Sequence, residues 1–440
     1  MPSMRTAVIS DLHLGALGGD DVAREGAERE ALVDAVRDAD RLVLLGDVIE
    51  LRERPLAESL DVARPVFEEL GRALAGRPVV LVPGNHDHAF AEPWLAGLRL
   101  DAQELARETE WPVGPDDGAL GRIAGWMPDV ELSLAYPGLH LRDDVYATHG
   151  HYLDLHLTIP RLESIAASAM ARVTGRGKAV RSASDYEAIM GPLYAFYAGL
   201  AQGASPASLS RGGSVSRDVW RRVSANGRPS VARFVLGRVT IPSAVAALNG
   251  LGLGPFRATL TGEELRRAGL LAMARVAEVL APRAEHVIFG HTHRPGPLPG
   301  DEPAEWTTLS GTRLWNTGAW LYESAFITGP GESPYWPGTV LTLEDEGPPR
   351  LENVLRKPGL PDVLSQPTRV TAAQSTRRIV MAEPVPAGSD VSSGTYRCTS
   401  CGNEIDVSST TSLPPCPSCG NGEWATQSGG DSAQDPYPNN

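Results

Sequence analysis

Five short polar clusters carry most of the side chains that could do chemistry in this chain. Each cluster follows an apolar, strand-like run, and together they supply carboxylate, carboxamide and imidazole groups. The clusters are Asp11-Leu12-His13, Gly46-Asp47, Gly84-Asn85-His86-Asp87, His149-Gly150-His151 and Gly290-His291-Thr292-His293. Because α/β folds place their chemistry at strand ends, and no short stretch can surround two ions, we expect these loops to converge on a pair of divalent cations.

In this order, the five clusters resemble the motifs of the calcineurin-like metallophosphoesterase superfamily over roughly residues 5 to 345. The resemblance implies an α/β fold, a four-layer sandwich of two mixed β-sheets flanked by helices. It also implies that Asp11, His13 and His293 hold one metal ion, that Asn85, His149 and His291 hold the other, and that Asp47 bridges them, with His86 as the catalytic imidazole. Glu50 replaces the Asp often found at its position, which points weakly to the subgroup resembling UDP-diacylglucosamine pyrophosphatases.

The residue types make chemical sense without the family. Two adjacent cations can share a hydroxide, lower its pKa toward neutrality and clamp phosphoryl oxygens as charge develops. An imidazolium at His86 would stabilise that charge or protonate the leaving alkoxide, and Asp87 would orient or charge that ring. The donor set suits Mn, Fe, Zn or Ni.

Each cluster alone is weak evidence for a site. An isolated Gly-Asp such as Gly46-Asp47 is usually a turn after a strand. His291 and His293 are more specific, because strand alternation would place both imidazoles on one side, where they are costly unless they bind something. His151 is a candidate substrate contact, with support of a metal ligand as the alternative. We expect structural roles for His140 and His286.

The composition of the chain and the positions of its cysteines indicate its domain organisation and its compartment. The chain has 440 residues, 42% of them hydrophobic, which predicts one large domain with attachments. A strand begins almost at the amino terminus, at Thr6, without a secretory pattern before it, so the expected compartment is the cytoplasm. The cysteines gather near the carboxyl terminus, which favours metal binding over disulfides.

These cysteines are spaced as a metal site. Two Cys-x-x-Cys pairs offer four thiolates to one tetrahedral ion, and the pattern resembles a rubredoxin-type zinc ribbon with one structural zinc; the ligands are Cys398, Cys401, Cys416 and Cys419. A closed shell of this kind does no catalysis, so the ribbon is a candidate docking surface for a protein partner. Its span from Tyr396 to Trp424 contains one Arg and three acidic residues, so no nucleic-acid partner is expected.

The predicted domains follow from these features. We expect a metallophosphoesterase domain at residues 1–345, a linker at 346–395, the zinc ribbon at 396–424 and a disordered tail at 425–440. The long segment between His149 and His291 shows helical periodicity from Leu155, with capping-box patterns at Ser184 to Glu187 and Thr261 to Glu264. It predicts a helical cap over about 155–283, with its last helix ending at Leu280 before Pro282.

This cap differs in charge from the rest of the chain. Residues 161–238 contain twelve basic and four acidic residues, a difference of +8 within a net charge of -14. The simpler explanation of this basic charge is that the residues lie on solvated helix faces. The functional explanation is that they steer an anionic substrate toward the site. The basic residues concerned include Arg172, Arg176, Lys178, Arg181, Arg217, Arg221 and Arg222.

An uncharged run follows the basic stretch, from Val239 to Phe256. Pro242, Pro255 and three glycines argue against a transmembrane helix, so a buried or lid segment is preferred. A lid facing lipid, which would suit an anionic headgroup with an acyl chain, is the alternative.

The sequence therefore predicts a binuclear metal-dependent phosphoesterase that hydrolyses a phosphorylated small-molecule or lipid-like substrate, either a phosphomonoester or a phosphodiester. One alternative is a nucleotide-linked pyrophosphatase similar to the UDP-diacylglucosamine enzymes. The other is a docking module without catalysis, which the retention of every ligand and of His86 disfavours.

Overall fold

The computed structural model forms two compact units, Met1–Pro367 and Thr368–Asn440. It describes residues 4–175, 180–203, 241–257, 262–323, 327, 333–356, 385–389, 391, 394–399, 403–407 and 412–429. Each unit is presented by itself.

The first unit contains a seven-stranded mixed sheet with strand order β11-β10-β1-β2-β3-β5-β4. Strands β1, β2, β3 and β5 run parallel, while β4, β10 and β11 pair antiparallel with their neighbours. The strands are β1 (Thr6–Ile9), β2 (Arg41–Leu44), β3 (Pro78–Leu81), β4 (Thr109–Pro112), β5 (Glu131–Tyr136), β10 (Thr339–Leu343) and β11 (Arg350–Asn353). Parallel strands end at the same edge, so the loops after β1, β2 and β3 meet there.

A second, four-stranded sheet has the order β6-β7-β8-β9. Here β6 pairs antiparallel with β7, and β7, β8 and β9 run parallel, so this sheet is also mixed. Its strands are β6 (Gly138–Arg142), β7 (Val145–Thr148), β8 (His286–Phe289) and β9 (Arg313–Asn316). The ends of β7 and β8 carry the fourth and fifth polar clusters.

The two sheets pack face to face through an apolar core. Val8, Val43 and Val80 of the first sheet share one cluster with Ala147 and Ile288 of the second. Side chains alternate along each strand, so the neighbouring positions point outward into a second cluster with the helices. This gives the layer order helix, sheet, sheet, helix, and it confirms the predicted four-layer fold.

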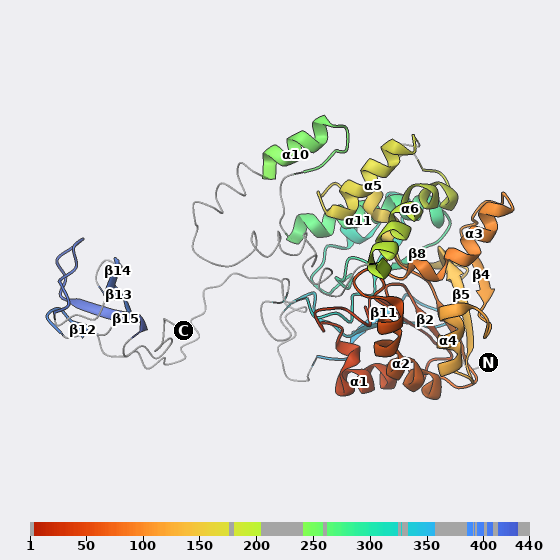
Figure 1. Cartoon of the computed structure of the whole chain (residues 1–440), viewed down its shortest axis with the longest axis horizontal. Helices are drawn as coiled ribbons and strands as arrows, with labels where there is room; N and C mark the ends of the chain where they lie inside the picture. The colour runs from red at the N-terminus through yellow and green to blue at the C-terminus, as the bar shows by residue number, and fades with distance from the viewer. Residues whose placement is uncertain are drawn as a thin grey trace. The chain divides into compact units, whose positions relative to one another are not determined.

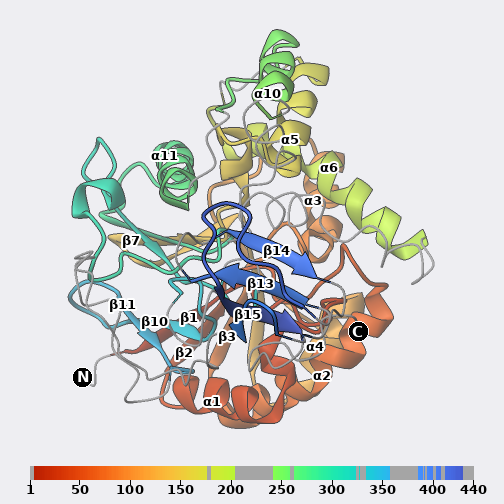
Figure 2. The ribbon, with the colours of Figure 1, turned by 90° about the vertical axis from the view of Figure 1, so that its left-hand side faces the viewer.

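Helices cover the outer faces of both sheets. On the first sheet α1 and α2 bury an apolar stripe that includes Leu32, Phe67 and Leu70. The helices are α1 (Gly26–Val36), α2 (Leu56–Ala73), α3 (Glu92–Leu100) and α4 (Gly118–Trp126), with the short turns η1 (Val22–Arg24), η2 (His88–Phe90), η3 (His151–Leu155) and η6 (Pro303–Trp306). Figures 1 and 2 show α1, α2 and α4 together at one side of this unit.

The segment between β7 and β8 contains four described α-helices joined by turns and irregular stretches. It forms α5 (Leu162–Val173), α6 (Ala183–Gly203), α10 (Ile241–Gly250) and α11 (Gly262–Leu280), which lie at the side of the unit opposite α1 and α2 (Figures 1 and 2). The expected end of the last helix at Leu280 is confirmed. No helix among these described ranges is both long and apolar enough to cross a bilayer.

The start of the segment differs from the sequence expectation. The periodic positions Leu155 and Ile159 precede helix α5, which begins at Leu162, after Pro160. Ser182, not Ser184, accepts the hydrogen bond from the Asp185 amide at the start of α6 (3.1 Å). The Ser184 hydroxyl instead accepts from the Leu105 amide (2.7 Å), so a long-range contact takes the place of the predicted cap.

Several residues of the predicted cap lie outside the described residues. These are Thr261 and the basic residues Arg176, Lys178, Arg217, Arg221 and Arg222. The uncharged run is described only from Ile241, where it forms α10.

The second unit holds a four-stranded sheet of order β12-β15-β13-β14. Its strands are β12 (Val385–Pro386), β13 (Gly394–Cys398), β14 (Glu404–Val407) and β15 (Glu423–Gly429). Strand β11 extends the first sheet past residue 345, and β15 continues through Gly429, beyond the predicted ribbon end at 424. The domain boundaries at 345 and 424 stay predictions.

Candidate metal centre

Backbone hydrogen bonds join the first cluster to the second and the fourth cluster to the fifth. The Asp11 amide donates to the Gly46 carbonyl (2.9 Å), and the His13 amide donates to the Asp47 carbonyl (2.8 Å). The Gly290 amide donates to the His149 carbonyl (2.9 Å). These bonds connect the strand ends within each sheet and bring the clusters to one edge of the sandwich, as the sequence predicts.

One group of possible metal ligands consists of Asp11, His13 and His293. His293 Nε2 lies 3.2 Å from Asp11 Oδ1 and 3.3 Å from His13 Nε2. Asp11 is fully buried and His13 is 3% exposed, so these polar atoms face one another away from bulk water. Their arrangement is that of a cation site.

A second group consists of Asp47, His149 and His291. His149 Nε2 lies 3.2 Å from Asp47 Oδ2 and has no hydrogen-bond partner among the described residues. The Asn85 carboxamide lies 3.1 Å from His291 Nδ1 and 3.3 Å from Asp47 Oδ2. The oxygen of this carboxamide can face both His291 and Asp47 when a cation lies among the three side chains.

Asp47 stands between the two groups. Its Oδ2 atom is 3.8 Å from His13 Nε2 of the first group and 3.2 Å from His149 Nε2 of the second. A single carboxylate that faces both sets of imidazoles can serve two adjacent ions.

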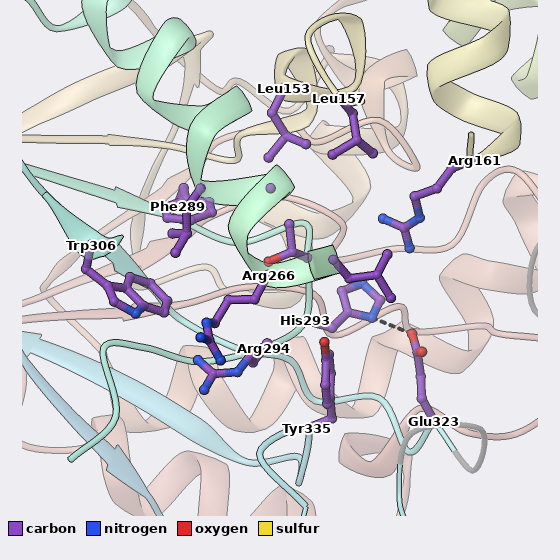
Figure 3. A pocket seen from close by; sticks show the side chains of 14 residues that line it. Leu153, Leu157, Arg161, Arg266, Phe289, His293, Arg294, Trp306, Glu323 and Tyr335 are labelled. Atoms are coloured by element: carbon purple, nitrogen blue, oxygen red, sulfur yellow. Dashed lines mark hydrogen bonds and ion pairs between the residues drawn. The ribbon is translucent and has the colours of Figure 1, made fainter. Parts of the chain in front are cut away.

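Each of the four histidines is held at its other ring nitrogen by an oxygen acceptor. Such support is typical of metal-binding histidines, because it fixes the tautomer and the ring orientation. The pairs are His13 Nδ1 with Glu50 (3.1 Å), His293 Nδ1 with Glu323 (2.5 Å), His149 Nδ1 with the Leu45 carbonyl (2.9 Å) and His291 Nε2 with Asp154 (3.1 Å). Figure 3 shows the contact between His293 and Glu323. The residues present therefore fit a pair of divalent cations.

The backbone at the site is strained. Asp11, His13, Asp47, His291 and His293 all have positive φ angles, between 45° and 65°. This region is sparsely populated for residues with a Cβ atom and costs on the order of 1–3 kcal/mol at each position. Strain at several neighbouring positions is maintained by the surrounding fold, which indicates a functional arrangement.

Two glycines allow the loops to approach the carboxylates. A Cβ atom on Gly84 would lie 2.3 Å from Asp47 Oδ1, and one on Gly290 would lie 2.4 Å from Asp11 Oδ2. Both contacts are far below van der Waals separation, so no other residue fits at these positions without moving the carboxylates.

The charges of the site perturb one another strongly. Burial favours the neutral form of each carboxyl group, but His149 and the neighbouring histidines outweigh this and hold the pKa values of Asp11 and Asp47 below their ordinary range. Burial also lowers the pKa of His149, but the charges of Asp47 and Asp11 raise it to about 9. The buried carboxylates thus create a strong local demand for positive charge.

His86 lies at the edge of both groups and is 21% exposed. Its Nδ1 atom is 2.6 Å from Glu50 Oε2, and its Nε2 atom is 4.0 Å from Asp47 Oδ2. Burial lowers the pKa of His86, but the charges of Glu50 and Asp47 outweigh burial. The pKa therefore lies above its ordinary value, which favours a protonated ring.

Asp87 does not contact the His86 ring, contrary to the sequence expectation. Its carboxylate accepts hydrogen bonds from the backbone amides of Val48 (2.7 Å) and Gly84 (2.6 Å). Asp87 therefore ties together the loops that carry Asp47 and Asn85, and Glu50 is the carboxylate that orients His86. Burial and the charge of Asp47 raise the pKa of Asp87 to about 6.

His151 is fully buried, so the structure does not place it as a substrate contact. Its Nε2 atom lies 3.3 Å from the Tyr136 hydroxyl, and its ring packs against Tyr152 and Tyr194. The centre of the His149 ring lies 5.6 Å from that of His151. Support of the candidate ligand His149, the alternative that the sequence left open, stays a prediction.

The sequence did not identify three residues that the structure brings to the site. Asp154 and Glu323 hold His291 and His293, and Arg52 lies 3.3 Å from His86 Nε2. Arg52 is five residues after Asp47, so its proximity in sequence is a signal that could have found it. Asp154 is three residues after His151 and carries the same signal, whereas Glu323 lies thirty residues after His293 and carries none.

A buried ion pair connects α6 to the site. His88 Nε2 is 2.9 Å from Glu187 Oε1, and Glu187 Oε2 accepts hydrogen bonds from Tyr136 (2.8 Å) and Tyr152 (3.0 Å). His88 and Glu187 are 3% and 8% exposed. The network joins helix α6 to strand β5 and to the turns η2 and η3.

We expect Glu187→Ala to lower the free energy of unfolding by about 3–5 kcal/mol, because it leaves His88 buried without its charge partner. Equilibrium unfolding in urea measures this. Tyr194→Phe on the same helix is the matched control, because the Tyr194 hydroxyl has no hydrogen-bond partner among the described residues. Equal destabilisation by both variants would contradict the assigned role of the pair.

The second unit brings three cysteines together. Cys398, Cys416 and Cys419 form a group of possible metal ligands, with the Sγ atoms of Cys398 and Cys419 at 3.7 Å. Cys401 lies outside the described residues. The Cys398 amide donates to the Asn403 carbonyl and the Cys416 amide to the Asn421 carbonyl, both at 2.8 Å. This repeated turn is what a pair of metal-binding loops requires.

The small core of this unit is built around the cysteines. Tyr396, Leu413 and Trp424 are buried against Cys398 and Cys416. A core of this size supplies little stability alone, so bound metal is expected to supply most of the folding free energy.

Chelation tests the metal dependence of this unit. We expect a zinc chelator to release one zinc ion and to unfold the ribbon. Unfolding would expose Trp424 to solvent, which changes its fluorescence, and would remove the protection of the amides in β13 and β15 from hydrogen exchange. Cys416→Ser should give the same result without chelator, and Ser412→Ala serves as its control. Retention of protected strands in the Cys416 variant would rule out metal-dependent folding.

Two family models match the chain. Residues 4–181 match the model described as calcineurin-like phosphoesterase, and residues 362–428 match the model of a zinc-ribbon containing domain. Both matches confirm the resemblances seen in the sequence. A comparison with curated proteins gave no significant match.

Solved structures of phosphatases are similar to the chain at low identity. A dimetal phosphatase from Danio rerio has 13% identity over 78% of this chain and 96% of its own, with a TM-score of 0.28. A cold-active protein-tyrosine phosphatase of a psychrophilic Shewanella species has 14% identity over 77% of this chain and 75% of its own, with a TM-score of 0.24.

Proposed function

We propose that this chain, whose residues 4–181 match the model of the calcineurin-like phosphoesterases, hydrolyses a phosphomonoester or phosphodiester with the help of two divalent metal ions. One observation carries the proposal. Two buried carboxylates, Asp11 and Asp47, face four histidines, and each histidine is held at its outer nitrogen by an oxygen acceptor.

The proposed ligands follow the two groups. Asp11, His13 and His293 would hold one ion, and Asn85, His149 and His291 would hold the other, with Asp47 shared between them. The set suits Mn, Fe, Zn or Ni, whose selection depends on geometry and availability. When bound, the ions would polarise the phosphoryl oxygens and supply a nucleophile from water at neutral pH.

His86 is proposed as the acid of the reaction. Glu50 accepts a hydrogen bond from His86 Nδ1, which leaves the Nε2 proton directed to the side of Asp47, where the phosphoryl group would lie. From there it can stabilise charge on the leaving oxygen or protonate it. Glu50 also supports His13, so a single carboxylate aligns the acid with a metal ligand.

Arg52 is proposed to bind the phosphoryl oxygens. Its Nη1 atom lies 3.3 Å from His86 Nε2, and its guanidinium group lies 4.3 Å from the centre of the Tyr197 ring. This stacking holds the side chain of Arg52 in place. A planar cation at this point can donate two hydrogen bonds to a phosphate group.

A substrate panel tests the proposal. Phosphomonoesters, phosphodiesters and nucleotide pyrophosphates are assayed with added Mn²⁺, using the full chain. We expect hydrolysis of a monoester or a diester. Preference for a nucleotide pyrophosphate would favour the alternative of a pyrophosphatase. If protein that contains both metals hydrolysed none of these substrate classes, the chain would be better described as a docking module without catalysis.

We propose the cytoplasm as the compartment, because the free cysteines belong to a metal site and none is left for disulfides elsewhere. We also propose that the zinc ribbon binds a protein partner.

A further inference from the structure

A cavity opens beside His293, in the first unit. It has a volume of about 690 Å³, which includes its open mouth, and it lies between turn η3, helix α11 and the loop after β8. Figure 3 shows His293 and Arg161 at this cavity, with Leu153, Leu157 and Phe289 also lining it.

The cavity adjoins the candidate metal centre directly. His293 lines it, and His293 Nε2 is 3.2 Å from Asp11 Oδ1. A phosphoester held at the metal centre would therefore have this cavity within reach of its organic group.

Most of the wall is apolar. Leu153, Leu157, Leu270 and Phe289 are each at most 5% exposed and face the cavity, and Leu265 completes this surface from α11. Apolar walls of this kind gain free energy when they exclude water from an apolar ligand.

Two of the arginines in the wall are already paired. Arg266 Nη2 lies 2.7 Å from Glu305, and Arg294 Nη2 lies 2.6 Å from Asp301. Their charges are neutralised, so they do not make this part of the cavity a site for a second phosphate.

Arg161 is different, because it makes no ion pair with any residue in the described ranges. It precedes helix α5, and its guanidinium group points into the cavity (Figure 3). The cavity thus places one cationic side chain against an apolar wall, next to a centre that would bind phosphate.

We propose that this cavity binds the organic group of the substrate and that this group is apolar, an aromatic ring or a short alkyl chain. The inference rests on the proposed phosphoesterase function and adds the chemical class of the substrate. Specificity would then come from η3 and α11, elements that the polar clusters do not include.

Binding of alkylphosphonates tests the inference without turnover. Methylphosphonate and hexylphosphonate are titrated calorimetrically into the full, manganese-loaded chain. We expect the hexyl compound to bind more tightly, by about fourfold for each methylene group buried and by at least about thirtyfold in total, with a negative heat-capacity change. Equal affinity for the two compounds would overturn the inference.

Two variants locate the effect in the cavity. Leu265→Gln makes the wall polar at nearly constant size. Gly269→Leu fills the cavity, and the new Cβ atom meets only Thr292 Cγ2, at 3.6 Å, which is an ordinary contact. Leu271→Gln is the matched control on the same helix, since Leu271 is 69% exposed.

We expect both cavity variants to reduce hexylphosphonate affinity at least tenfold, to leave methylphosphonate affinity within about twofold, and the control to change neither. Equal loss of both ligands would place the effect at the metal centre and overturn the inference. The substrate panel separates the two proposals. Hydrolysis without dependence on the organic group defeats only the cavity proposal, whereas the absence of any hydrolysis defeats the phosphoesterase function itself.

Discussion

Asp47→Asn is expected to lower kcat/KM for the best phosphoester by at least about 10³-fold, because metal ions contribute several kcal/mol of charge stabilisation and each tenfold in rate corresponds to about 1.4 kcal/mol. Asp47 is the carboxylate that faces both groups of histidines, at 3.8 Å from His13 and 3.2 Å from His149. Asparagine keeps the size of the side chain but removes the charge that two cations would share. We therefore expect the variant to lose metal as well as activity.

Steady-state kinetics and elemental analysis of the purified variant measure both effects. Asp61→Asn is the matched control, because Asp61 lies on the exposed surface of α2 and its change leaves the site untouched. A variant of Asp47 that retained both metals and full turnover would remove the bridging role and, with it, the proposed two-metal arrangement.

His86→Ala is expected to lower kcat by about 10²- to 10⁴-fold while the metal content stays close to that of the wild type. The ring is held by Glu50 at 2.6 Å and belongs to neither of the two groups assigned to the ions, although with His13 and Glu50 it forms a further group of possible ligands. Its loss removes a proton donor and a positive charge at the phosphoryl group but no metal ligand.

His140→Ala controls for the loss of an imidazole elsewhere. The His140 side chain is 42% exposed and pairs with Glu108 on the surface. Full turnover in His86→Ala would exclude the acid role. Loss of metal together with activity would instead make His86 part of the metal set, and elemental analysis distinguishes these results.

Glu50 shows how far the sequence could be read. Its place three residues after Asp47 marked it as a substitution for a frequent Asp, and no role followed from that alone. In the fold its carboxylate contacts both His13 and His86, which come from different strands. Asp87 shows the converse, because its position next to His86 in the sequence suggested a contact that the turn after Gly84 directs elsewhere.

The sequence by itself determined the residue types and the strands that precede them, and the resemblance to a family implied the layers. Continuous apolar runs at β1, β2, β3 and β8 predict buried strands, and polar clusters that follow strands predict a site at their ends, because both signals depend on neighbours in the chain. The spacing of the cysteines predicts the ribbon for the same reason.

Only the tertiary structure decided what supports the site and what lies beside it. Asp154 holds His291 across 137 positions, and Leu157 and Phe289 meet at one cavity although they belong to different elements. Such contacts depend on how sheets and helices pack, and packing depends on the shape of every side chain in the core. The local periodicity of the sequence does not predict this packing. The contacts that support the ligands, and the cavity beside His293, are therefore seen only in the folded chain.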